Sequence, residues 1–145
     1  MKSLLEKLPF YNSLVLPYHF LQAILAGLMF GFPGRKLRVI AVTGTNGKTT
    51  TCFMIWKMLN ESGRKTGLLT TVAYGVEKLK PELGHMTTVD ALTLNHRIAE
   101  IQKEGAKFLV LETTSHALAE FRTLGIPVEI AVFTNLTHED RKSVV

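Results

Sequence analysis

Short apolar runs alternate with amphipathic segments along most of the chain, beginning near Leu37. Runs rich in Val, Ile, Leu and Thr predict strands, and apolar residues at helical spacing predict helices between them. In chain order, the predicted elements are a strand at 37–42, a helix at 49–62, a strand at 66–74, a helix at 90–104, a strand at 108–111, a helix at 115–124 and a strand at 128–134. Such alternation is typical of βαβ units. It predicts an α/β domain over 37–145, built on a mostly parallel sheet with flanking helices.

The predicted helix at 49–62 has one clear apolar face. Its apolar residues recur at positions i, i+3, i+4 and i+7, namely Cys52, Ile55, Trp56 and Leu59. Cys52 is the only cysteine, which excludes an intrachain disulfide and a cysteine-based zinc cluster. Its place on the apolar face predicts a buried thiol rather than a nucleophile.

The first 36 residues form a separate, apolar segment in this prediction. No formally charged residue occurs from Phe10 to Gly34, and the stretch 14–32 is long enough to cross a bilayer. Pro17 and two glycines within the stretch argue against a span. The favoured alternative is a helix at about 18–30 that lies on the domain or on a membrane surface.

Composition and charge limit the classes of partner. With 145 residues, 46% of them hydrophobic and 20% charged, the chain has the apolar content of one globular domain. A net charge of +5 suits an anionic partner such as a nucleotide or a lipid surface. The basic residues form no long run and no stripe interleaved with aromatic residues, so no nucleic-acid partner is expected.

The strongest chemical signal is the octapeptide T-G-T-N-G-K-T-T at 43–50, between a predicted strand and a predicted helix. Glycines let the main chain approach an anion, and the N–H groups at a helix N-terminus carry partial positive charge. Lys48 can reach the outer phosphates of a nucleotide, and the Thr49 hydroxyl can ligate Mg²⁺. The general phosphate-loop spacing requires glycine at position 42, where this chain has Val42, so the loop belongs to a variant class.

This octapeptide resembles the ATP-binding signature of the Mur ligase family, which joins amino acids to the muramoyl-peptide precursor of bacterial peptidoglycan. Further segments resemble family motifs in the same order: M-T-T at 86–88, E-T-T-S-H-A-L at 112–118 with Arg122 after it, and A-V-F-T-N-L-T at 131–137. Together they are most similar to the UDP-N-acetylmuramoyl-tripeptide synthetase branch. The resemblance covers about 37–139.

The resemblance implies an ATP-dependent ligation in the cytoplasm, with a UDP-N-acetylmuramoyl-peptide and an amino acid as substrates. ATP phosphorylates the terminal carboxylate of the precursor, and the amine of the amino acid then attacks the acyl phosphate. Because a carboxylate is a poor electrophile and phosphate is a good leaving group, such a protein mainly aligns the reactants and neutralises charge.

The same resemblance implies a role for individual residues. The residues expected at the nucleotide are Gly44, Thr45, Asn46, Gly47, Lys48, Thr49, Thr50 and Asn135. Thr49 and Glu112 are expected to hold Mg²⁺, and Lys48 and Glu112 are the expected catalytic residues. The residues expected at the precursor are Thr87, Thr88, Ser115 and Arg122.

Two of these assignments have structural alternatives. Glu112 could instead cap the helix that follows it, because an acidic residue near a helix N-terminus is stabilising. Thr87 and Thr88 could belong to the N-cap region of the helix that begins near Asp90. Ser115 and His116 could suggest a hydrolase pair, but neighbours in sequence rarely place nucleophile and base in contact.

The sequence also departs from the family pattern. Asp140 stands where the family has a metal-binding histidine, and an aspartate could still bind Mg²⁺. The segment 1–36 replaces the family's uridine-binding domain, and the later parts of the family's chain are absent. We therefore expect a truncated ligase, with a complementing chain as an open possibility. The alternatives are a nucleotide-binding module without ligase activity of its own and a membrane-attached protein that makes peripheral contact through 14–32.

Overall fold

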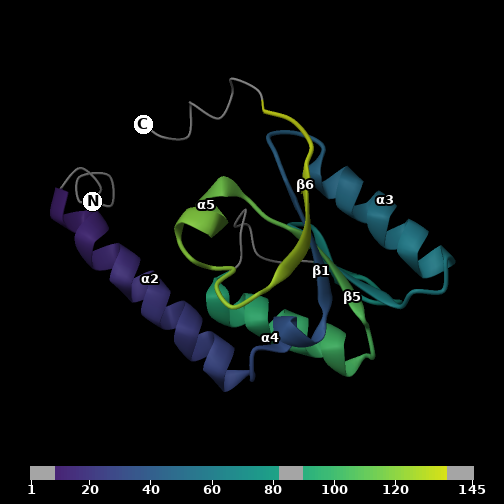
Figure 1. Cartoon of the computed structure of the whole chain (residues 1–145), viewed down its shortest axis with the longest axis horizontal. Coiled ribbons are helices and arrows are strands. Elements are labelled where there is room, and N and C mark those ends of the chain that lie inside the picture. Colours follow the sequence, from purple (N-terminus) through teal and green to yellow (C-terminus); the bar gives the residue numbers. More distant parts are fainter. Residues whose placement is uncertain (1–8, 82–89, 137–145) are drawn as a thin grey trace.

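The computed structural model describes residues 9–81 and 90–136. A central sheet carries helices on both of its faces, and a long N-terminal helix lies along one side (Figure 1). The elements are α2 (Pro9–Met29), the short 3-10 helix η1 (Pro33–Lys36), β1 (Arg38–Thr43), α3 (Lys48–Glu61), β2 (Thr66–Leu69), β3 (Ala73–Gly75), β4 (Lys80–Pro81), α4 (Ala91–Lys103), β5 (Phe108–Glu112), α5 (Ser115–Ala119) and β6 (Val128–Phe133).

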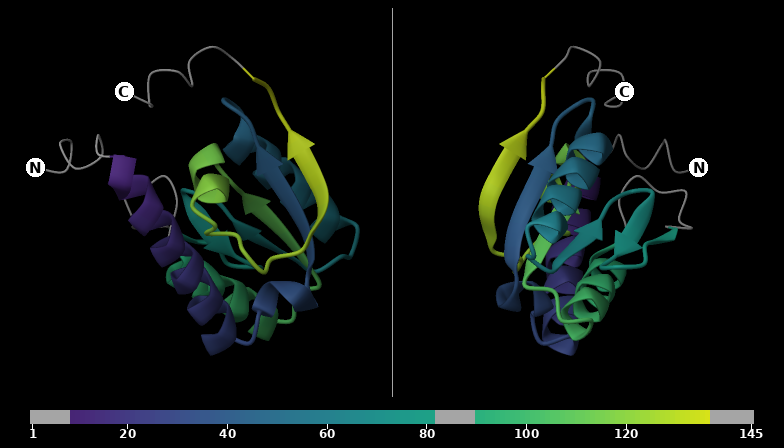
Figure 2. Two further views of the ribbon diagram at one scale, coloured as in Figure 1. Left: turned by 60° about the vertical axis from the view of Figure 1, so that its left-hand side comes forward. Right: turned by 90° about the vertical axis from the view of Figure 1, so that its right-hand side faces the viewer.

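The six strands lie in the order β4-β3-β2-β5-β1-β6. The four strands from β2 to β6 in this order are parallel, whereas β3 and β4 are antiparallel to their neighbours. The sheet is therefore mostly parallel, as the alternation of strands and helices predicted. Figure 2 shows β6 at one edge of the sheet and the short β3 and β4 strands at the opposite edge. Because β1 lies between β5 and β6, the segment after β1 meets the carboxyl ends of both neighbours.

Side chains from alternate positions of the strands form two cores. Val42, Leu68 and Val110 point toward α3, where they pack against Cys52 and the partly buried Trp56. The opposite face of the sheet packs against α4. The buried residues of this second core include Val39, Leu69, Leu109 and Leu111 from the strands and Leu94 and Ile98 from α4. This alternation is the period of two that a strand buried on both faces requires. The apolar face predicted for the helix that follows β1 is also confirmed, because Cys52, Ile55, Trp56 and Leu59 all pack in the first core.

The single strand predicted at 66–74 is wrong. The chain reverses after Leu69, and Ala73–Gly75 returns as β3 beside β2. Both the N–H and the hydroxyl of Thr70 donate to the Ala73 carbonyl at 2.9 Å, so Thr70 closes the turn. The turn contains no glycine or proline, and Thr and Val favour strands on either side of it. Residue composition alone therefore gave no signal for the reversal.

The helix predicted at 115–124 is shorter in the structure. α5 ends at Ala119, and turns continue to Gly125. Phe121 adopts a left-handed conformation, with φ at 55°, which cannot continue a right-handed helix. The Arg122 N–H donates to the Ala117 carbonyl at 3.0 Å and satisfies one of the last carbonyls of the helix.

The N-terminal helix is longer than predicted and includes Pro17. Its small residues Ala23 and Ala26 pack against Ala91 of α4, with Leu124 beside them. The helix therefore lies on the α/β domain, which is one of the two placements that the sequence left open. No helix within 9–81 and 90–136 is long and apolar enough to cross a membrane.

Asp90 caps α4 and offers a test of this fold. Its carboxylate accepts from the Thr93 N–H at 2.9 Å. Burial opposes the charged form, but the hydrogen bonds from Thr93 and from the main chain at Leu92 and Asp90 together outweigh it and lower the pKa of Asp90. We expect Asp90→Ala to reduce the free energy of unfolding by about 1 kcal/mol in urea titrations at neutral pH. Asp90→Asn should lose less stability than Asp90→Ala, because an asparagine side chain can still accept the cap hydrogen bond.

The same bonds predict a pH dependence. A carboxyl group whose pKa is lowered on folding stabilises the native state above its unfolded pKa, and this contribution is lost as the pH falls through the folded pKa. We expect the difference in stability between the wild type and Asp90→Asn to diminish below about pH 4. A constant difference down to pH 2 would contradict this role of the charge.

Candidate functional site

The loop 44–47 joins the carboxyl end of β1 to the N-terminus of α3. Gly47 is the N-cap residue of α3 and has a positive φ of 79°. No side chain caps the helix, and no acidic residue occurs in its first turn. The first N–H groups of α3 therefore retain the partial positive charge that an anion can bind.

The Lys48 side chain folds back over this loop. Its ammonium group donates to the carbonyl oxygens of Gly44 at 2.7 Å and Thr45 at 2.9 Å. These two bonds fix the position of the charge above the loop and leave one N–H of the ammonium for a further acceptor. The arrangement places a cation where a phosphate would approach the helix N-terminus.

Residues from the end of β6 hold the loop from the other side. The Asn135 side-chain oxygen accepts from the Asn46 N–H at 3.0 Å, and its amide nitrogen donates to the Asn46 carbonyl at 3.1 Å. The Thr45 N–H donates to the Asn135 carbonyl at 3.1 Å, and the Thr134 hydroxyl donates to the Asn46 carbonyl at 2.7 Å. The side chain of Asn135 thus binds the main chain of the loop in both directions.

This contact leaves no room for a side chain at Gly44. A Cβ atom there would lie 2.1 Å from the Thr134 hydroxyl oxygen and 3.0 Å from the Asn135 nitrogen. Gly44 also has a φ of 136°, which residues with a side chain rarely adopt. Glycine is therefore required at this position for two independent reasons.

Glu112 lies on the other side of the loop, at the carboxyl end of β5. The register pairs Val42 with Glu112, which brings the carboxylate beside the start of α3. Glu112 is 8% exposed, and its carboxylate accepts from the Thr49 hydroxyl at 3.0 and 3.1 Å. It also accepts from the Thr71 N–H at 3.2 Å. Thr71 was not predicted as a site residue, because the sequence placed it inside a single strand at 66–74 and gave no signal that the chain reverses after Leu69.

Thr49 and Glu112 are a suitable pair of ligands for Mg²⁺. Two adjacent ligands of an octahedral Mg²⁺, each at about 2.1 Å, lie about 3 Å apart. The Thr49 and Glu112 oxygen atoms are already separated by 3.0 to 3.1 Å. The described parts of the chain contain no group of three or more His, Cys, Asp or Glu residues that could hold a metal. Mg²⁺ commonly takes one or two protein oxygens and completes its shell with phosphate and water oxygens, so two ligands suffice.

Cys52 lies in the first core, below this site. Burial raises the pKa of its thiol to about 12, the negative charge of Glu112 adds to the increase, and Lys48 opposes it. The group is therefore a neutral thiol at physiological pH and is fully buried. These properties agree with the structural role predicted for it.

The alternative role of Glu112 as a helix cap is not supported. Thr114 is the N-cap residue of α5, and its hydroxyl accepts from the Ala117 N–H at 3.2 Å. The carboxylate of Glu112 points instead to Thr49 and Thr71. Glu112 is thus part of the site around loop 44–47, together with Asn135.

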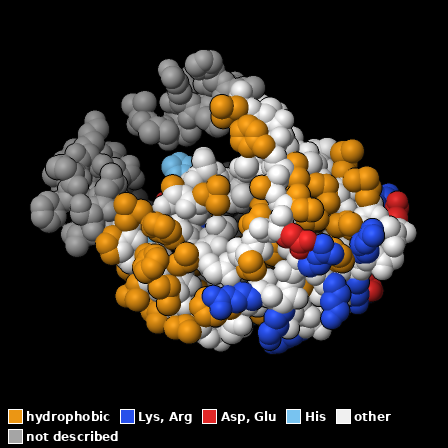
Figure 3. Space-filling model, in the orientation of Figure 1, with side chains coloured by type: hydrophobic (Ala, Val, Ile, Leu, Met, Phe, Trp, Pro, Cys, Tyr) orange, Lys and Arg blue, Asp and Glu red, His pale blue; other side chains and the backbone are white. Residues whose placement is uncertain are grey.

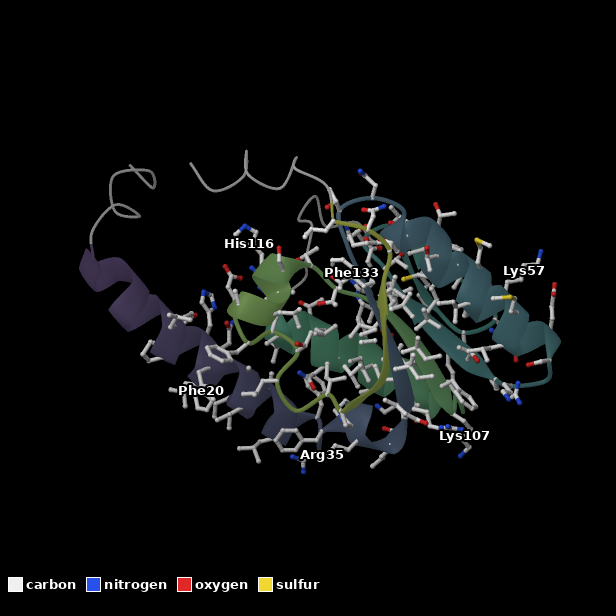
Figure 4. All side chains as sticks on the ribbon, turned by 45° about the horizontal axis from the view of Figure 1, so that its top comes forward. Phe20, Arg35, Lys57, Lys107, His116 and Phe133 are labelled. Carbon is white, nitrogen blue, oxygen red and sulfur yellow. The ribbon has the colours of Figure 1, made fainter. Side chains whose placement is uncertain are left out.

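The residues predicted at the precursor are not assembled in the same way. Thr87 and Thr88 lie outside the described residues, and Asp90 is the N-cap residue of α4. Ser115 is exposed at the first turn of α5, and the Arg122 guanidinium donates to the carboxylate of Glu120 at 2.6 Å. Figure 4 shows His116 of α5 on the outer surface of the molecule, where it is exposed. The precursor-binding roles remain predictions.

The Mur ligase middle domain matches residues 42–140, which include loop 44–47, Glu112 and Asn135. The chain belongs to the Mur ligase family. It is similar to several proteins named UDP-N-acetylmuramoyl-L-alanyl-D-glutamate–2,6-diaminopimelate ligase. That of Syntrophomonas wolfei is 43% identical over 117 residues, which cover 81% of this chain and 24% of the relative. That of Aquifex aeolicus is 45% identical over 112 residues, which cover 76% of this chain and 23% of the relative.

A solved structure of a ligase of the same name agrees with the sequence matches. It has a TM-score of 0.64 and 40% identity, and the match covers 70% of this chain and 20% of that chain. Because addition of an amino acid to a dipeptide yields a tripeptide, these names agree with the tripeptide synthetase branch of the Mur ligases predicted from the motifs. The chain spans about a quarter of the length of these curated relatives.

Two glycines of the loop provide a matched test of its packing. Gly44 and Gly47 both have positive φ, but a Cβ atom at Gly47 would meet no atom within 4 Å. We expect Gly47→Ala to cost about 1 kcal/mol of stability through backbone strain alone. Gly44→Ala should cost about 3 kcal/mol, because Thr134 and Asn135 must also move. Urea unfolding of the two variants measures the difference, and equal losses would show that Thr134 and Asn135 do not constrain the loop.

Proposed function

We propose that this chain is the ATP-binding part of a Mur ligase that adds an amino acid to a UDP-N-acetylmuramoyl-peptide. The observation that carries the proposal is the position of Glu112. Its carboxylate lies 3.0 Å from the Thr49 hydroxyl, at the N-terminus of the helix that begins with Lys48. An acidic residue, a hydroxyl and a cation around one helix N-terminus are the groups that a nucleotide triphosphate with Mg²⁺ requires.

Each residue of the site has a defined part in this proposal. The first N–H groups of α3 bind phosphate oxygens, and Lys48 turns its free N–H toward the outer phosphates. Thr49 and Glu112 hold Mg²⁺, which would neutralise charge on the phosphates. Thr71 keeps the Glu112 carboxylate oriented through its N–H group. The protein then has only to align the γ-phosphate with the precursor's terminal carboxylate.

Asn135 acts through the loop in this proposal. Its side chain is already bonded to the N–H and carbonyl groups of Asn46. We therefore assign it to positioning the nucleotide-binding main chain, in place of the direct nucleotide contact implied by resemblance. Thr134, which the sequence did not single out, has the same role through its bond to Asn46.

The substrates are proposed as chemical classes. The similar ligases are named for 2,6-diaminopimelate and L-alanyl-D-glutamate, and we extend to this chain only the joining of an amino acid to a muramoyl-peptide. Thr87, Thr88, Ser115 and Arg122 are proposed to meet the precursor. ATP and UDP-linked precursors are cytoplasmic compounds, so we place the reaction in the cytoplasm. Ligation also requires the parts of such a ligase outside this sequence, on a longer polypeptide or on a complementing chain.

A second candidate is a nucleotide-binding module that does not ligate by itself. It is favoured by the share of the relatives that the chain spans, which is 24% or less for the two named above. Release of ADP that depends on the muramoyl-peptide and the amino acid distinguishes the two. MgATP binding without such release would favour the module.

Lys48 provides the direct test of nucleotide binding. We expect Lys48→Ala to weaken MgATP binding about tenfold to a hundredfold in calorimetric titrations, because a charge-assisted bond to phosphate is lost. Lys57→Ala is the matched control, since Lys57 is exposed on the same helix and pairs only weakly with Glu61 at 3.9 Å. Equal affinity of the two variants would refute the assignment of the loop.

Asn135 and Asn60 form a second matched pair. Asn60 bonds the main chain of Thr66 in both directions at 3.1 Å, as Asn135 does for Asn46, but at the far end of α3. We expect Asn135→Ala and Asn60→Ala to lose similar stability, about 1 to 2 kcal/mol. Only Asn135→Ala should also weaken MgATP binding, by about tenfold. If both variants bind MgATP as the wild type does, the loop does not depend on Asn135.

A further inference from the structure

Helix α2 buries its small residues and exposes its large apolar ones. Ala23 and Ala26 are each 1% exposed against the domain, whereas Leu21, Leu25 and Leu28 are 54% to 62% exposed. A helix that packs only on its own domain would bury the leucines and expose the smaller residues. The outward face of α2 is thus built for an apolar contact outside the described chain.

The exposed residues form one continuous stripe. Tyr18, Leu21, Leu25 and Leu28 follow one another at alternating spacings of three and four residues, which places them on one side of a helix. Met29, also exposed, lies at the C-terminal end of the stripe. Figure 3 shows the resulting apolar surface over α2. A patch of this kind marks an interaction site.

The first charged residues after the stripe are basic. The segment Pro9–Met29 has no charged residue, and Glu6 is the only acidic residue before Glu61. Arg35 and Lys36, the last two residues of η1, are exposed, and within 9–81 and 90–136 neither forms an ion pair. The Arg35 guanidinium lies 4.3 Å from the centre of the Phe32 ring, which holds it at the end of α2 (Figure 4).

We propose that this face of α2 lies in the surface of a bilayer that contains anionic lipids. The leucines would enter the acyl region, Tyr18 suits the boundary between acyl chains and headgroups, and Arg35 and Lys36 would meet lipid phosphates. A second copy of the chain is a poorer occupant, because its helix α2 has no acidic residue that could pair with Arg35 and Lys36. The contact is independent of the proposed nucleotide site, which involves none of these residues.

Sedimentation with lipid vesicles tests the proposal on the whole chain. We expect the protein to bind vesicles that contain phosphatidylcholine and phosphatidylglycerol, and to bind pure phosphatidylcholine vesicles more weakly. Leu21→Gln with Leu25→Gln should lower the partition coefficient about tenfold, because two apolar side chains no longer enter the bilayer. Arg35→Gln with Lys36→Gln should remove most of the preference for anionic vesicles, and added salt should do the same.

Matched controls exclude a general effect of surface hydrophobicity. Met54 and Met58 on α3 are each 59% exposed, and Met54→Gln with Met58→Gln should leave vesicle binding unchanged. Every variant should retain thermal unfolding at the wild-type temperature, because the substituted side chains are exposed. The proposal fails if the wild type stays in the supernatant with anionic vesicles, or if the α3 control loses binding equally. It also fails if the mass in solution is that of a dimer and Leu21→Gln with Leu25→Gln restores the monomer, since a second copy would then cover the face.

Discussion

Three neighbouring parallel strands have their carboxyl ends side by side, and the whole candidate site depends on the register of these strands. Loop 44–47 follows β1, Glu112 is the last residue of β5, and Asn135 lies two residues after the end of β6. Because β1 lies between the other two, a loop of four residues receives a carboxylate on one side and an amide on the other. Residues separated by more than 60 positions in sequence are thereby brought within hydrogen-bond distance, as with Thr49 and Glu112. Parallel strands characteristically place ligand-binding groups at this edge.

Much of this arrangement could be predicted from the sequence. The alternation of apolar runs with amphipathic segments gave the parallel strands and the helices α3 and α4, because each pattern has its own period. The octapeptide at 43–50 gave the loop, since glycine, lysine and threonine have distinct chemical tasks there. Glu112 was expected at the site because the segment 112–118 resembles a family motif.

Other features depend on contacts that local patterns do not encode. The reversal at Thr70 uses side-chain hydrogen bonds between residues that favour strands, so composition could not reveal it. Thr71 and Thr134 belong to the site only because their strands end beside the loop. The side of α2 that faces the domain was also beyond prediction, because Ala23 and Ala26 are less apolar than the leucines that remain outside. Close approach of two helices through small residues decided the orientation.

Asn135 also links the loop to the outermost strand of the described sheet. β6 has a partner only on the β1 side, and most of its side chains are exposed on both faces. The residues that follow it directly hold the main chain of Asn46. A small shift of β6 would therefore move the main chain of Asn46 and change the shape of loop 44–47. The geometry of loop 44–47 thus depends on how firmly the outer strand of the sheet is held in place.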